Sequence, residues 1–182
     1  MPHISLGNDA PGIVSLFAYQ PETAKPMVEL VDRLLCGPNT LSRGDRELIG
    51  AYVSSLNDCS FCTNSHAAFA AAQLPEGMAL VDQVRADLDT APVSPKMRAL
   101  LRIAGAVQRG GKHVRDEDVA AAREAGATDL EIHDTVLISA MFCLANRYVD
   151  GLATVLPEDP ASYAQMAEVI VNVGYGAISG QP

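Results

Sequence analysis

Residues 47–66 read ELIGAYVSSLNDCSFCTNSH and bring one acid, two cysteines and one histidine close together in the chain. If the segment from Cys59 to His66 is helical, successive side chains rotate by about 100° around the helix axis. The side chains of Cys59, Cys62 and His66 then lie within roughly 60° of one another, on one face. Two thiols and an imidazole on one helical face predict either redox chemistry or metal binding.

The residues just before this helix favour a reactive thiolate. Asn57 and Asp58 are good N-cap residues, which would place Cys59 in the first helical turn. Free amide groups and the helix dipole stabilise an anion there, so a thiolate forms more easily than in bulk water.

Glu47 is the acid of the stretch and lies on the preceding predicted helix, over residues 42–56. The apolar stripe of that helix points away from Glu47. On the side of Glu47 lie Gly50, Ala51 and Ser54, which are small enough to let another helix approach closely. A solvated helix face would give the same pattern.

The composition describes one folded domain. The chain has 182 residues, 48% of them hydrophobic and 19% charged, which is enough to bury a substantial core. The net charge of -9 repels a phosphate backbone, so nucleic acid is excluded as the expected partner. We expect residues 1–25, which mix Pro, Gly and Asn with a short apolar piece, to form an arm on a domain over residues 26–182.

The sequence also predicts the compartment. The first residues lack the basic start and apolar run of a signal peptide, and the longest apolar run, residues 135–145, is too short to cross a bilayer. We therefore expect a soluble, cytoplasmic protein that does not act at a membrane. The four cysteines then have no expected role as a structural disulfide framework, and the close pair points to redox cycling or metal binding.

Periodic apolar residues predict an all-α fold, with no segment of sustained two-residue alternation. Helix starts are predicted at Ser42 with Asp45, at Ser94-Pro95 and at Thr128 with Glu131. The predicted helices cover residues 27–35, 42–56, 59–73, 80–88, 95–109, 116–125, 129–156 and 162–173. Because strands are absent, a thioredoxin-like setting for the Cys-X-X-Cys is disfavoured.

One short internal repeat is visible. Residues 41–49 and 93–101 share a serine cap, an arginine (Arg46 and Arg98) and an apolar pair, but Ala99 stands where the first copy has Glu47. This pattern indicates one scaffold helix that is used twice and carries the acid once.

The spacing Glu47-X11-Cys59-X2-Cys62-X3-His66 resembles the alkyl hydroperoxidase D branch of the carboxymuconolactone decarboxylase-like superfamily. The likeness is widest over residues 46–71. It extends to the peroxidase-related subgroup through residues 11–13, the helix start at 41–42 and Asn146-Arg147. The decarboxylases of the superfamily lack the cysteine pair, so the resemblance argues against that activity.

The resemblance implies an all-α, single-domain helical bundle with an N-terminal arm, assembled as a homotrimer or hexamer. It implies a thiol-dependent peroxidase in which Cys62 attacks a hydroperoxide, Cys59 resolves the product, and Glu47 and His66 relay protons. No bound cofactor is expected, and a dithiol or lipoyl-type protein would be the reductant. Phe61 stands where the closest relatives of alkyl hydroperoxidase D carry a second histidine, so that relay lacks the group or uses water.

Three other interpretations fit the same residues. Cys59, Cys62 and His66 could bind zinc, with Glu47 or water as the fourth ligand. The pair could instead serve a disulfide reductase or a thiol sensor, which also needs an exposed cysteine pair of low pKa. Finally, both cysteines could simply be small buried hydrophobic residues.

Overall fold

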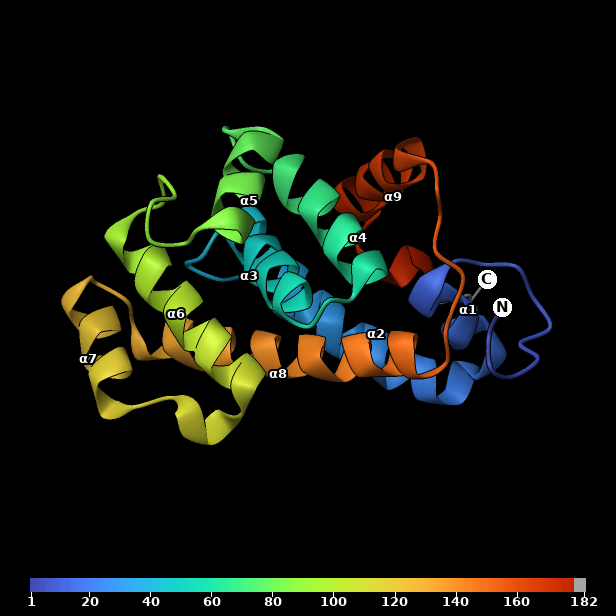
Figure 1. Ribbon diagram of the computed structural model, residues 1–182, viewed down its shortest axis with the longest axis horizontal. Helices are drawn as coiled ribbons and strands as arrows, with labels where there is room; N and C mark the ends of the chain where they lie inside the picture. Colours follow the sequence, from blue (N-terminus) through green and yellow to red (C-terminus); the bar gives the residue numbers. More distant parts are fainter. Residues whose placement is uncertain (179–182) are drawn as a thin grey trace.

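Helices alone make up the regular structure of residues 1–178, which the computed structural model describes, and this confirms the all-α prediction (Figure 1). The α-helices are α1 (Gly12–Tyr19), α2 (Pro21–Cys36), α3 (Arg43–Leu56), α4 (Ser60–Ala71), α5 (Gly77–Ala86), α6 (Pro95–Arg109), α7 (Asp116–Glu124), α8 (Asp129–Gly151) and α9 (Pro160–Val173). Two 3-10 helices, η1 (Gly111–His113) and η2 (Tyr175–Ile178), follow α6 and α9. Helix α8 extends along the length of the molecule and contacts α1, α2, α3, α4, α6 and α7.

The predicted helix starts are confirmed by capping geometry. The Ser42 hydroxyl accepts a hydrogen bond from the Asp45 N–H at 3.0 Å, and the Asp45 carboxylate accepts one from the Ser42 N–H at 3.2 Å. Thr128 and Glu131 form the same reciprocal pair at the start of α8. Each pair satisfies amide groups that have no partner within the helix, which is why the chain becomes helical at these points.

The internal repeat corresponds to a repeated helix-turn-helix unit. In the first unit Arg46 of α3 donates to the carbonyl oxygens of Leu34 and Gly37 at 2.8 and 3.0 Å, at the end of α2. In the second unit Arg98 of α6 donates to the carbonyl oxygens of Leu88 and Ala91, just after α5. Each arginine thus binds carbonyl groups that have no helical partner and fixes the angle of the turn.

The small face of α3 receives α8, as the sequence predicted. A Cβ atom on Gly50 would lie 2.3 Å from Cζ of Phe142, so only glycine lets this ring lie against the helix. One turn further along, the Asn146 amide of α8 donates to the Ser54 hydroxyl at 3.0 Å. The face that carries Glu47 is therefore buried, and the alternative of a solvated face is wrong: Glu47 is 1% exposed.

The chain ends differ from the expectations in detail. The N-terminal segment contains α1, and backbone hydrogen bonds from His3 to Leu152 and from Gly12 to Val155 join it to the region after α8. Because α2 begins at Pro21, the expected boundary at residue 25 falls inside a helix. Helix α8 ends at Gly151, earlier than expected, where Ala153 takes a positive φ of 48°. Residues 179–182 of the expected domain lie outside the described part.

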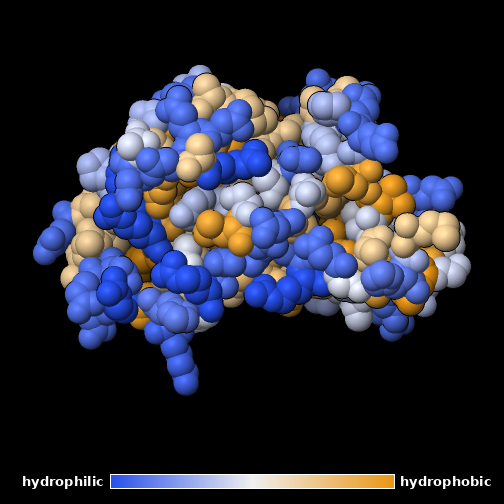
Figure 2. Space-filling view, in the orientation of Figure 1, coloured by the Kyte–Doolittle hydropathy of each residue, from blue (hydrophilic) through white to orange (hydrophobic). Residues whose placement is uncertain are grey.

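The surface seen in Figure 2 mixes hydrophilic and hydrophobic residues, with hydrophobic patches at the centre and toward the end where α1, α8 and α9 meet. Within residues 1–178, no helix combines the length and apolar character that a membrane span needs.

Candidate redox site

The two cysteines of the Cys-X-X-Cys lie at the N-terminus of α4, and this helix starts one residue later than predicted. Cys59 is the N-cap, with extended backbone (φ -81°, ψ 96°), and the helix starts at Ser60. Asp58 takes a positive φ of 58° and turns the chain between α3 and α4. The prediction of Cys59 within the helix was therefore wrong, and Cys62 is the cysteine in the first turn. The free amide groups of that turn favour an anion at Cys62.

The environment shifts the pKa values of the two buried thiols in opposite directions. The hydrogen bond between the two side chains lowers the pKa of Cys62 and raises the pKa of Cys59. Burial raises both pKa values, and a hydrogen bond from the Asn146 side chain lowers that of Cys62 further. When the pair has lost one proton, the remaining proton is therefore favoured on Cys59, which then donates to the sulfur of Cys62.

Glu47 and His66 form a hydrogen-bonded pair next to the cysteines. Nδ1 of His66 lies 2.7 Å from Oε2 of Glu47. The other carboxylate oxygen, Oε1, accepts a hydrogen bond from the hydroxyl of Tyr175 at 2.7 Å. Since a carboxylate only accepts, Nδ1 carries the proton when Glu47 is ionised, and Nε2 is the unprotonated nitrogen of the neutral ring.

Aromatic rings surround the imidazole of His66. The Phe142 and Phe69 rings meet it edge to face, with centroids at 4.4 and 5.1 Å, and the Tyr175 ring is nearly parallel to it at 6.2 Å. The His66 side chain is 13% exposed. These rings keep bulk water from the pair and thereby strengthen its electrostatic interactions.

On the other side of the cysteines, Asn146 belongs to a polar chain that links three helices. Its Oδ1 accepts a hydrogen bond from the Asn57 side chain at 2.8 Å, while its amide donates to Ser54. Gln108 of α6 donates to Oδ1 of Asn57 at 3.0 Å. This chain holds Asn146 beside Cys62 and joins α3, α6 and α8 at the site.

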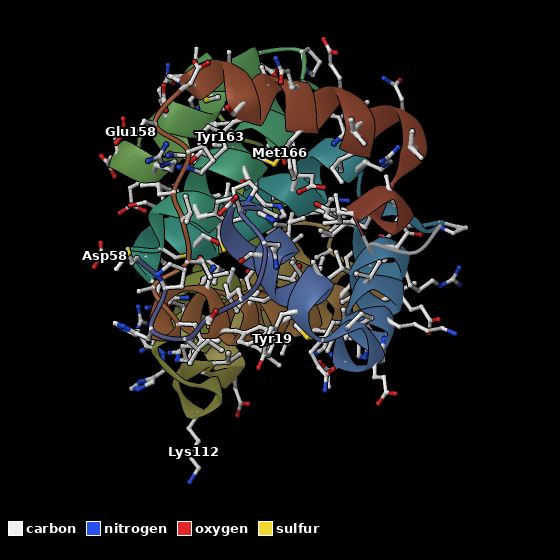
Figure 3. All side chains as sticks on the ribbon, turned by 90° about the vertical axis from the view of Figure 1, so that its right-hand side faces the viewer. Tyr19, Asp58, Lys112, Glu158, Tyr163 and Met166 are labelled. Carbon is white, nitrogen blue, oxygen red and sulfur yellow. The ribbon has the colours of Figure 1, made fainter. Side chains whose placement is uncertain are left out.

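A cavity of about 340 Å³ opens onto Cys62 and His66. Its walls come from α1, α2, α4, α8, α9 and η2, and most of the lining side chains are apolar. Figure 3 looks at this end of the molecule, where α1 lies between α9 above and α8 below. Ser65, Ser162 and Gln165 are polar residues of the lining, and the buried Ser65 hydroxyl has no hydrogen-bond partner within residues 1–178. The site is thus a thiol of lowered pKa at the wall of a mostly apolar cavity.

All four predicted site residues come together in this region. Glu47 is on α3, while Cys62 and His66 are on α4 with Cys59 at its N-cap. Among residues 1–178, no three His, Cys, Asp or Glu side chains are grouped so as to hold a metal ion. The site geometry therefore gives the zinc interpretation no support.

Sequence reasoning missed Tyr175 and Ser65, and it gave Asn146 no role at the site. Tyr175 follows the last helix and lies 128 positions from Glu47, so no local spacing connects the two residues. Its position directly after Gly174 is the only local sequence signal that could have drawn attention to Tyr175. Asn146 was visible as part of the family likeness, but its contact with Cys62 requires that α8 cross α4.

Comparisons with known proteins agree with this arrangement. The sequence model of the carboxymuconolactone decarboxylase family matches residues 21–73, which include all four predicted site residues. No curated protein matched the chain.

Two solved structures are similar over most of their length. One is described as an uncharacterized peroxidase-related protein from Silicibacter sp. TM1040. It is 25% identical, with a TM-score of 0.75 over 85% of this chain and 78% of that chain. The other is described as an alkylhydroperoxidase AhpD core, an uncharacterized peroxidase-related protein from Ralstonia eutropha JMP134. It is 27% identical, with a TM-score of 0.77 over 88% and 82% of the two chains.

The fold and the cysteine site thus define the class as an all-helical protein with the architecture of the alkylhydroperoxidase core. The match of the family model over residues 21–73 and the likeness to these two structures support the resemblance to the alkyl hydroperoxidase D-like, carboxymuconolactone decarboxylase-like superfamily that the spacing of the cysteines and histidine predicted.

Proposed function

We propose that the protein is a thiol-dependent peroxidase that reduces hydrogen peroxide or organic hydroperoxides. The observation that carries the proposal is the asymmetry of the cysteine pair: Cys62 lines the cavity, and the hydrogen bond between the two side chains lowers the pKa of Cys62 while it raises the pKa of Cys59. The peroxidase-related descriptions of the two structural neighbours support it at the level of the family.

The first step is attack of the Cys62 thiolate on the terminal oxygen of a hydroperoxide, ROOH. The O–O bond breaks, the sulfur becomes a sulfenic acid, and an alkoxide departs. The proton that Cys62 gave up is held on Nε2 of His66 and passes to the alkoxide, which leaves as an alcohol. Glu47 stabilises the imidazolium during this interval through its hydrogen bond to Nδ1.

The second step forms a disulfide. The Cys59 thiol attacks the sulfenic sulfur of Cys62, and the hydroxyl group leaves as water. An external dithiol then reduces the disulfide and restores both thiols. No bound cofactor takes part. A dithiol or lipoyl-type protein as reductant, and assembly into a homotrimer or hexamer, are proposals that rest on the family resemblance.

The test is intact mass and thiol counting after one equivalent of cumene hydroperoxide. The wild type should lose two thiols, and Cys62→Ser should lose none because the attacking group is gone. Cys59→Ser should undergo one oxidation at Cys62 and then stop, since no resolving thiol remains.

The control is Cys36→Ser. Cys36 is half-buried at the end of α2, outside the cavity lining, so this variant should behave as the wild type. Unchanged thiols in the wild type, or peroxide turnover by Cys62→Ser at the wild-type rate, would sink the proposal. A pair that exchanges with disulfides but ignores peroxide would indicate a reductase or sensor instead.

A further inference from the structure

We propose that Tyr175 is a positioning residue for the proton relay: its hydroxyl holds the Glu47 carboxylate, and through it fixes which nitrogen of His66 is free to exchange protons. The inference deepens the proposed peroxidase function and rests on it. Tyr175 itself would not contact the substrate's reacting oxygens. Its effect reaches them only through Glu47 and His66.

The hydrogen bonds divide the Glu47 carboxylate between two donors. Tyr175 donates to Oε1 at 2.7 Å, and His66 lies on Oε2 at 2.7 Å. Glu47 is 1% exposed and Tyr175 is 3% exposed, so water does not compete for these oxygens. Because each carboxylate oxygen accepts from one donor, Oε2 remains the acceptor that holds the imidazole proton on Nδ1.

The backbone after α9 is built to deliver this tyrosine. Gly174 ends the helix with a positive φ of 91°, and a Cβ there would lie 2.8 Å from Oδ1 of Asp32. That same oxygen accepts the backbone N–H of Tyr175 at 2.9 Å. Asp32 of α2 thus anchors the turn that places the Tyr175 ring beside His66, with the two rings at 15° to each other.

The surroundings keep the Tyr175 hydroxyl protonated, so that it acts only as a donor. Burial raises its pKa strongly, and the negative charge of Glu47 and the hydrogen bond to it raise the pKa further. The titratable groups around the pair come from three helices: Asp32 and Cys36 of α2, Arg43 and Glu47 of α3, and His66 of α4. Arg43 is the cation among them and lowers the Tyr175 pKa slightly against the trend.

Losing the hydroxyl should leave Oε1 of Glu47 buried without a donor. The carboxylate would then draw the shared proton away from Nδ1 of His66, and the imidazole would lose its fixed tautomer. Proton transfer to the departing alkoxide would slow, while the phenylalanine ring would keep the apolar part of the cavity wall that Tyr175 supplies. The predicted signature is a fall in kcat at nearly constant KM.

The experiment compares Tyr175→Phe with the wild type in two measurements. Nitrogen-15 NMR of His66 should show the share of the Nδ1-protonated tautomer falling. Steady-state peroxide reduction should show kcat lower by about tenfold, the size expected for one hydrogen bond to a charged group, with KM changed by less than about twofold. Tyr52→Phe is the matched control, because Tyr52 is on α3 like Glu47 but contacts Gly105 of α6, away from the cavity.

Unchanged His66 signals and an unchanged kcat in Tyr175→Phe would overturn the inference. If Tyr175→Phe fails to fold, 3-fluorotyrosine placed at position 175 keeps the ring and hydroxyl while strengthening the donor, and it must shift the His66 signals or the inference is wrong. If the wild type reduces no peroxide, the proposed function fails. A tautomer change in Tyr175→Phe would then still support the positioning role.

Discussion

Cys59 and Cys62 show how position decides the chemistry of a single residue type. Both are buried thiols, yet Cys62 lies in the first turn of α4 and receives hydrogen bonds from Cys59 and Asn146, whereas Cys59 is the N-cap and donates. The attacking and resolving roles proposed for them follow from this difference. The cysteine with the lower pKa more readily forms the nucleophilic thiolate, and the cysteine with the higher pKa stays a thiol until the sulfenic acid has formed.

This asymmetry predicts that Cys62 reacts with iodoacetamide at lower pH than Cys36. Burial raises the pKa of Cys36, while the hydrogen bond from Cys59 lowers the pKa of Cys62. A lowered pKa means that the thiolate persists as the pH falls, so labelling of Cys62 should continue below the pH at which labelling of Cys36 has stopped. Quantitative mass spectrometry of the labelled peptides, from about pH 5 to about pH 10, measures the extent of labelling of Cys62 and Cys36 in one sample.

Replacing Cys59 provides the matching control. Cys59→Ala removes the largest cause of the lowered Cys62 pKa, so the labelling curve of Cys62 should move to higher pH while that of Cys36 stays in place. Identical curves for Cys62 in the two proteins would show that Cys59 does not stabilise the thiolate.

At the scale of the helices, the start of α8 is held by one buried carboxylate. Glu131 accepts hydrogen bonds from Lys96 of α6 at 2.8 Å, from the Thr40 hydroxyl at 2.9 Å and from the Thr128 N–H at 2.7 Å. Burial alone would raise its pKa, but these donors outweigh burial and lower the pKa to about 2. Helix α8, which carries Phe142 and Asn146 to the site, is therefore tied to α6 and to the loop before α3.

Glu131→Gln should consequently destabilise the protein at neutral pH by about 3 kcal/mol. A carboxyl whose pKa is depressed in the folded state contributes stability above its unfolded pKa and loses it as the pH falls through the folded value. The difference between variant and wild type should thus shrink as the pH falls from about 5 toward 2. Urea unfolding at pH 7, 4 and 3, as approximate settings, measures it.

Glu124→Gln, at an exposed position at the end of α7, is the control for the loss of one charge and should change the free energy of unfolding little. A pH-independent difference for Glu131→Gln would show that the carboxylate is not the source of the stability.

Over the whole molecule, the features that the sequence predicts are those formed by residues close together in the chain. The cap pairs at Ser42 and Thr128 and the small face around Gly50 are local patterns, and the structure confirms each of them. The predicted start of the cysteine helix was one residue too early because Asp58 has a positive φ. The sequence indicates this only through the general tolerance of Asp for the left-handed backbone region. Tyr175 was missed because only the closed bundle brings the end of α9 to α3.

The cavity is also a property of the whole bundle, since six elements supply its walls. Its apolar lining predicts that an organic hydroperoxide is a better substrate than hydrogen peroxide, because burying the organic group adds binding energy of about 25 cal/mol per Å². Ala145 of α8 is half-buried in this wall. Ala145→Leu should fill part of the cavity and lower kcat/KM for cumene hydroperoxide by roughly tenfold, with less than about twofold effect on hydrogen peroxide.

The matched control is Ala140→Leu, the same substitution at an exposed position of α8 that does not line the cavity. It should leave kcat/KM for both peroxides unchanged. Because the proposed mechanism requires only Cys62 and the proton relay for hydrogen peroxide, the rate with this substrate reports whether Ala145→Leu has disturbed Cys62 or His66. If Ala145→Leu lowers kcat/KM equally for both peroxides, the substitution has disturbed the reacting groups. If the wild type has equal kcat/KM values for cumene hydroperoxide and hydrogen peroxide, the apolar walls do not select the substrate.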